Sequence, residues 1–126
     1  MRGIGRPDVF EAENIRDWRQ RDVVDSDNKK IGSLEAIYVD TKTDEPLFAS
    51  VVEGGLGRRR LTFVPLSGAV VGPGWVKVRY AKKTVRGAPS IGTDDELLAT
   101  QEPQLFDHYG LAYDTGSDGA RRLARR

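Results

Sequence analysis

Short apolar segments that alternate with polar residues constrain the fold of this 126-residue chain more than any other feature. In residues 21–86 apolar side chains recur at every second position, as Val76, Val78 and Tyr80 do. Turn-forming residues divide this region into roughly five to seven short strands, at intervals of about ten residues. The spacing predicts a mainly β fold, a small antiparallel barrel or sandwich, and closure into a barrel would remove exposed sheet edges.

Several strands carry more specific expectations. Gly32 interrupts an apolar run and predicts a bulge or bend. Leu61 and Phe63 share one face and are expected to point into the barrel. The β-branched pair Thr84 and Val85 is expected to extend the sheet.

The segment 47–52 is apolar on both of its faces. Ala49 and Val51 share one face, and Phe48 and Val52 share the other. Burial of the second face against another copy of the chain explains this pattern, as does a covering helix. We favour a homodimer with a two-fold interface.

The character of the sequence changes after residue 89. Residues 93–96 resemble a helix-capping box, and residues 102–110 are typical of a second short helix, with Pro103 in its first turn and Gly110 near its end. We expect a flexible arm over residues 1–13, a barrel over 14–89, a helical extension packing on the barrel over 90–111, and a disordered basic tail over 112–126.

Charge is segregated along the chain although its total is nearly neutral. Twenty Lys and Arg residues balance nineteen Asp and Glu residues, which argues against a generally basic nucleic-acid binder. Residues 77–86 carry only basic charges, residues 94–118 only acidic ones, and residues 121–126 include a further group of arginines. These blocks could attract each other within one chain or between two chains.

Few residues are equipped for catalysis or for binding a metal. The chain has no cysteine and one histidine, which excludes thiol nucleophiles, Cys-ligated metals and sites that need two imidazoles. Asp107 cannot orient His108 as in a catalytic triad, because consecutive helical residues point about 100° apart. The acidic turn at residues 25–28 lacks the glycine and glutamate of a calcium loop. We therefore expect a non-enzyme with no cofactor and no metal.

No segment reaches the ~18 consecutive apolar residues of a membrane span. The first residues contain no apolar stretch typical of a secretory signal. We therefore expect a cytoplasmic protein without direct membrane insertion.

Five stretches occur in an order that is characteristic of one family: residues 23–32, 37–40, 63–66, 85–89 and 107–110. The first stretch is a strand followed by a polar turn and Lys-Ile-Gly, and the second is a strand ending in Asp. The third is a strand ending in Val-Pro-Leu, the fourth resembles the end of a barrel, and the fifth resembles a helical extension. The chain resembles the PRC-barrel family, which includes the cytoplasmic domain of the photosynthetic reaction centre H subunit and the C-terminal domain of a ribosome-maturation factor.

The resemblance implies a PRC-type β-barrel that serves as a non-catalytic docking or assembly module with a protein partner. An RNA-associated module of the ribosome-maturation type is one alternative, and a partner of a membrane electron-transfer complex, as in the reaction centre, is another. The proposed contact residues are Arg58, Arg59, Arg60, Asp107, His108 and Tyr109. A basic stripe for nucleic acid would combine Lys77, Arg79, Lys82, Lys83 and Arg86 with Arg58 and Arg60.

Overall fold

The computed structural model describes residues 18–54, 59–116 and 119–126. The arm predicted over residues 1–13, the first residues of the predicted barrel and Arg58 lie outside the described residues. None of the helices within the described ranges is long and apolar enough to cross a membrane.

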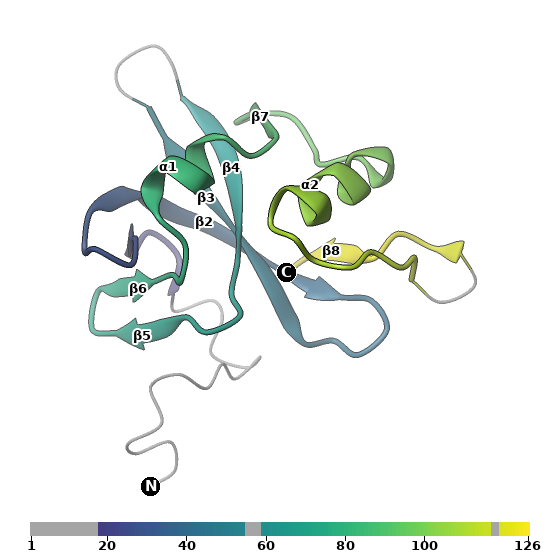
Figure 1. Ribbon diagram of the computed structural model, residues 1–126, viewed down its shortest axis with the longest axis horizontal. Coiled ribbons are helices and arrows are strands. Elements are labelled where there is room, and N and C mark those ends of the chain that lie inside the picture. The colour runs from purple at the N-terminus through teal and green to yellow at the C-terminus, as the bar shows by residue number, and fades with distance from the viewer. Residues whose placement is uncertain (1–17, 55–58, 117–118) are drawn as a thin grey trace, which may run out of the picture.

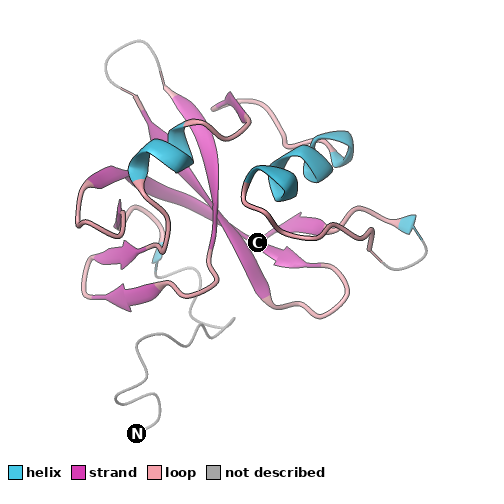
Figure 2. Cartoon of the chain, in the orientation of Figure 1, coloured by secondary structure: helices cyan, strands magenta, loops and turns pink. Residues whose placement is uncertain are grey.

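A mostly antiparallel sheet of eight strands dominates the fold (Figures 1 and 2). In chain order the elements are β1 (Asp22–Val24), β2 (Lys30–Asp40), β3 (Pro46–Glu53), β4 (Arg60–Pro65), β5 (Val70–Gly72), β6 (Trp75–Lys77), α1 (Lys82–Arg86), β7 (Ser90–Gly92), the 3-10 helix η2 (Ala99–Gln101), α2 (Glu102–His108) and β8 (Leu123–Arg125). The strands follow the order β5-β6-β1-β2-β3-β4-β7, and β8 pairs with β2. The predicted mainly β fold with short helices is confirmed, whereas no pairing within the described residues joins β5 to β7 to close a barrel.

The turn between β1 and β2 forms as the sequence predicts. Asn28 adopts a positive φ of 65°, which asparagine tolerates in tight turns. The buried carboxylate of Asp25 accepts the backbone N–H groups of Asp27, Lys29 and Lys82, each at 2.8 Å. Burial opposes ionisation of Asp25, but these three donors and the nearby Lys29 charge together lower its pKa. One carboxylate therefore fixes the turn and joins it to α1.

Gly32 lies at the predicted irregularity. Val23 pairs with Gly32 and Val24 pairs with Lys30, so Ile31 is the extra residue of a bulge. A Cβ atom on Gly32 would lie 2.1 Å from the backbone oxygen of Val52. The close approach of β2 and β3 therefore requires glycine at this position.

Each face of the central strands is buried against its own hydrophobic core. The inner core contains Trp18, Val23, Ile31, Leu34, Ile37, Val39, Ala49, Val51, Val64, Leu66, Ala69, Val76, Val78 and Val85. The outer core contains Ala36, Tyr38, Phe48, Leu61, Phe63, Ala88, Leu97, Leu105, Phe106, Tyr109 and Leu123. The second apolar face of β3 is thus covered by α2 and the C-terminal segment of the same chain, so the sequence argument for a homodimer loses its basis.

Two expectations for the sheet are wrong. Leu61 and Phe63 face the outer core, while Val64 faces the inner one. Both faces of β4 are buried, so alternation alone cannot tell inside from outside. Thr84 and Val85 lie in α1 and not in a strand. Val85 alone packs into the inner core, an arrangement that a single helical turn satisfies.

The helical extension is confirmed in one part and corrected in another. Helix α2 matches the predicted second helix, and Gly110 follows it with a φ of +72°. Residues 93–96 do not begin a helix. Asp95 accepts the backbone N–H of Gly92 at 3.1 Å, and η2 begins only at Ala99. Asp95 therefore closes the turn after β7. Its side chain bonds to the backbone of this turn and does not cap a helix.

The expectation of a disordered tail is wrong for residues 119–126. Residues 123–125 form β8, which pairs antiparallel with residues 38–40 of β2. Leu123 is fully buried in the outer core. Glycine, serine and arginine dominate the sequence from Asp114 onward and predict disorder, but the rest of the fold supplies partners for this segment.

Candidate binding site on the outer face

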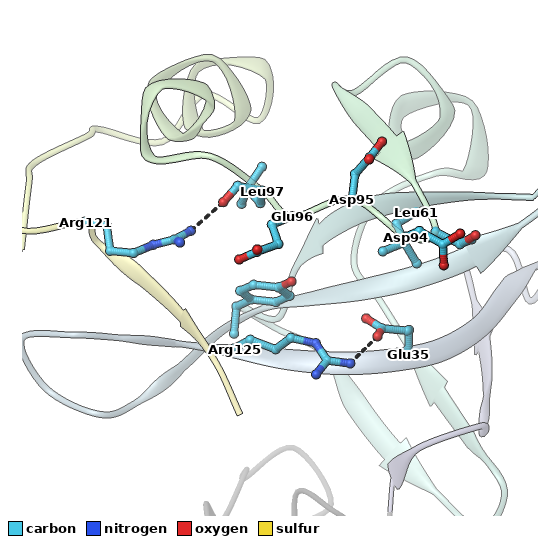
Figure 3. A pocket seen from close by; sticks show the side chains of 10 residues that line it. Glu35, Leu61, Asp94, Asp95, Glu96, Leu97, Arg121 and Arg125 are labelled. Atoms are coloured by element: carbon cyan, nitrogen blue, oxygen red, sulfur yellow. Dashed lines mark hydrogen bonds and ion pairs between the residues drawn. The ribbon is translucent and has the colours of Figure 1, made fainter.

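A cavity of about 330 Å³ opens where β8 and the loop after β7 meet the outer face of the sheet (Figure 3). Its floor comes from β2 and β4, and the loop 93–97 and the C-terminal segment form its walls. The lining residues are Glu35, Tyr38, Leu61, Thr93, Asp94, Asp95, Glu96, Leu97, Arg121 and Arg125.

The floor of the cavity is organised around Glu35. Its carboxylate pairs with the guanidinium of Arg125 (Figure 3). It also accepts the hydroxyl of Ser50 at 2.5 Å. Hydrogen bonding to Glu35 raises the pKa of Arg125. Burial, reinforced by Glu35, raises the pKa of Tyr38, so its phenol stays protonated at neutral pH. The floor thus already holds an arginine side chain.

The rim of the cavity is acidic. Asp94, Asp95 and Glu96 are all exposed. Asp95 is engaged by the backbone of Gly92, whereas no ion pair or hydrogen bond within the described ranges engages Asp94 or Glu96. The rim therefore presents carboxylates to solvent beside the arginine that the floor holds.

Glu102 anchors the C-terminal segment beside this cavity. It is fully buried at the start of α2. Its Oε1 accepts the Tyr113 hydroxyl and the Arg122 backbone N–H, both at 2.8 Å. Its Oε2 accepts the Leu123 backbone N–H at 3.1 Å and the Arg121 Nε at 3.3 Å. Four donors thus satisfy a carboxylate that would otherwise be costly to bury.

Every arginine of residues 121–126, which we call the arginine strand, faces a carboxylate on the rest of the molecule. The pairs are Arg121 with Glu102, Arg122 with Asp40, Arg125 with Glu35, and Arg126 with Asp44. We call these four carboxylates, together with the edge of β2 at residues 38–40, the acceptor surface. It gives the arginines of residues 121–126 partners of opposite charge within the same chain.

Of the residues proposed from the sequence, the five that the structure describes lie elsewhere, and none of these five lines the cavity. Arg59 is exposed, and the exposed Arg60 donates to the Ser90 hydroxyl. Asp107 is exposed, and the exposed His108 holds its Nε2 2.7 Å from the backbone oxygen of Thr84 in α1.

Tyr109 does not suit a surface contact. It is 9% exposed, and its hydroxyl donates to the Phe63 backbone oxygen at 2.5 Å. Its ring lies edge-on to Tyr80, with 4.9 Å between the ring centroids. Tyr109 therefore joins α2 to β4 inside the outer core, as an aromatic residue with a polar tip commonly does.

A second charged surface forms around α1. A depression of about 360 Å³ is lined by Asp25, Asp27, Lys29, Ala81, Lys82, Lys83 and Arg86. Arg86 pairs with Glu53, and the Asp25 carboxylate is occupied by backbone donors. The basic block of residues 77–86 thus lies partly on helix α1.

Sequence reasoning missed the residues of the acceptor surface. In the sequence Asp40 stands out only as the end of a strand, and Glu35 and Asp44 belong to no visible motif. The available signal was the charge segregation, with a group of arginines directly after a long acidic block. That signal indicated attraction between the blocks but not which carboxylates would take part.

Comparison with known proteins identifies a family for residues 10–85 but not a site. Residues 10–85 match the family model described as PRC-barrel domain. A search of curated proteins gives no match. The cavity combines residues inside the matched segment, such as Glu35 and Tyr38, with the loop 93–97 and the arginine strand, which lie beyond it.

Proposed function

Because the chain belongs to the PRC-barrel family, we propose that it is a non-catalytic binding and assembly module whose partner is a protein. PRC-barrel domains are generally non-catalytic. The observation that carries the proposal is the acidic cavity, in which Glu35 holds a guanidinium and the rim presents Asp94 and Glu96. Its volume suits one or two anchoring side chains at the centre of a larger protein interface.

The charge of the cavity favours a partner that presents cationic side chains. Arginine is enriched at protein interfaces, and its planar guanidinium matches carboxylates in geometry. Complementary charge at a rim mainly accelerates association and selects the partner. We therefore expect binding that weakens as ionic strength rises.

Capture of partners from native lysate, with and without nuclease, tests this function. The wild-type chain should retain a stoichiometric protein partner after nuclease treatment. The double variant Asp94→Lys/Glu96→Lys should lose it, because both exposed carboxylates of the rim change sign. Asp27→Lys, an exposed acidic position in the β1–β2 turn and away from the cavity, is the matched control and should retain it. Loss of every partner with nuclease, or equal capture by the rim variant and the control, would contradict the proposal.

The basic depression beside α1 supports an RNA-associated module as the second candidate. Lys29, Lys82 and Lys83 present positive charge on one surface, and phosphate contacts make such binding steeply salt-dependent. Lys82→Glu/Lys83→Glu should then abolish retention of RNA at low salt, while Lys42→Glu on the β2–β3 turn should not. Equal retention by the two variants would remove this candidate.

A further inference from the structure

We propose that the acceptor surface is a binding site for an arginine-rich extended segment of the partner protein, and that the chain's own arginine strand occupies it in the unbound molecule. This inference rests on the function proposed above and names the chemistry of the partner. The seated arginine strand is the observation from which the ligand is deduced.

The backbone of β2 supplies the first part of the recognition. Strand β3 pairs along one edge of β2, and β1 pairs with residues 30–33 on the other edge. Strand β8 pairs with residues 38–40 of β2, on the same edge as β1. Flanking bonds of 2.9 Å run from the Thr41 N–H to the Arg122 oxygen and from the Arg126 N–H to the Ile37 oxygen. Such main-chain bonds accept any extended peptide and supply affinity without sequence preference.

Carboxylates supply the preference for arginine. Asp40 holds Arg122 with 3.0 Å between carboxylate oxygen and Nε, and the Arg122 guanidinium also lies 5.7 Å from the centre of the Phe106 ring. Glu35 pairs with Arg125, the last residue of β8, and Asp44 pairs with Arg126. Guanidinium groups stack on aromatic rings and pair with carboxylates, whereas lysine does so less well.

A buried leucine gives the segment its register. Leu123 is fully buried between the arginine pairs, within the outer core. Glu102 accepts the backbone N–H groups of Arg122 and Leu123, and Thr41 donates its hydroxyl to the Arg121 oxygen at 2.7 Å. The matching ligand is therefore an extended segment with two arginines, a leucine, one spacer residue and two further arginines.

The arginine strand, which we call the resident strand where it occupies its own site, is held in a way that lets a partner segment compete with it. Only three residues pair in β8, and the segment before it is largely exposed at Ala112, Asp114, Thr115, Gly119 and Ala120. The Arg126–Asp44 pair is 48% and 74% exposed, and exposed pairs contribute little. Local release of such a strand costs less than global unfolding. A tethered strand nevertheless competes at an effective concentration in the millimolar range, so the site of the wild-type chain is largely self-occupied.

A fluorescent peptide with the sequence of residues 119–126 tests the inference in chains that comprise all 126 residues. The Leu123→Asp variant should release the resident strand, because it places a carboxylate beside Glu102. The peptide should bind this variant about tenfold or more tightly than it binds the wild type, where the tethered strand competes. A control peptide that carries the same Leu→Asp change should not bind either chain.

A second variant and a site variant complete the test. Arg121→Ala/Arg125→Ala loosens the resident strand because it removes two of its ion pairs. This variant replaces Leu123→Asp as the releasing variant if circular dichroism shows that Leu123→Asp is unfolded. Adding Glu35→Gln to the releasing variant should weaken peptide binding. The inference is overturned if a folded releasing variant binds the peptide no more tightly than the wild type does, or no more tightly than the control peptide. In that event, continued dependence of partner capture on Asp94 and Glu96 would leave the proposed function standing.

Discussion

The carboxylate of Glu102, fully buried in the first turn of α2, accepts the backbone N–H of Leu123 at 3.1 Å. This bond attaches the last strand of the structure to the helix that covers the outer face of the sheet. With the Arg122 N–H and the Arg121 Nε on the same carboxylate, it positions the arginine strand along β2. One side chain thus connects the helical extension, the C-terminal segment and the candidate site.

Glu102→Gln should destabilise the protein by about 2–4 kcal/mol. The amide keeps the volume of the side chain but replaces an acceptor oxygen with a donor, which leaves buried N–H groups and the Arg121 charge without a carboxylate. Urea denaturation measures the free energy of unfolding. The exposed Asp107→Asn on the same helix is the control, with an expected change below about 0.5 kcal/mol. Equal stabilities of the two variants would refute this role of Glu102.

Gly32→Ala should cost about 2 kcal/mol or more, because its Cβ would overlap the Val52 backbone oxygen, which cannot rotate away. Gly74→Ala is the matched control, since a Cβ there meets nothing within 4 Å and only the φ of +77° opposes it. Its expected cost is about 1 kcal/mol. Thermal or urea unfolding compares the two, and a smaller loss at Gly32 than at Gly74 would show that β2 and β3 do not approach as described.

Tyr109→Phe should flatten the loss of stability at alkaline pH. Burial, reinforced by Tyr80 and Glu53, raises the pKa of Tyr109 well above its ordinary value. The unfolded chain therefore releases this proton at about pH 10, whereas the folded chain retains it, and stability falls as pH rises beyond that value. Urea denaturation between about pH 9 and pH 11 measures the slope. Identical slopes for wild type and variant would contradict the buried, protonated phenol.

A double-mutant cycle on Glu35→Gln and Arg125→Ala should give a coupling energy of about 0.5–1 kcal/mol. The two side chains are 25% and 51% exposed, so solvent screens their attraction. The coupling should fall when salt is raised to about 1 M, because the Debye length then shortens to about 3 Å. A coupling that is zero at low salt would mean that Arg125 does not occupy the cavity floor.

The sequence predicts the sheet better than it predicts the site. The bulge at Gly32 and the turn at Asn28 follow from local chemistry, and helix α2 follows from Pro103 and Gly110, so these features are visible in single segments. The orientation of Leu61 and Phe63 is not visible, because both faces of β4 are buried. The partners of Leu123 and of the arginines lie far away in sequence, and local composition therefore suggested disorder where the fold supplies a docked strand.

Amide hydrogen exchange of the wild-type chain tests most directly whether the arginine strand docks on the acceptor surface. The N–H groups of Arg122 and Leu123 should be strongly protected, because both donate to a fully buried carboxylate. The exposed Gly119 and Ala120 provide an internal reference in the same segment. Exchange of Arg122 and Leu123 at least about tenfold slower than in an unstructured chain would support the docked strand. Exchange at the unstructured rate at both residues would contradict it.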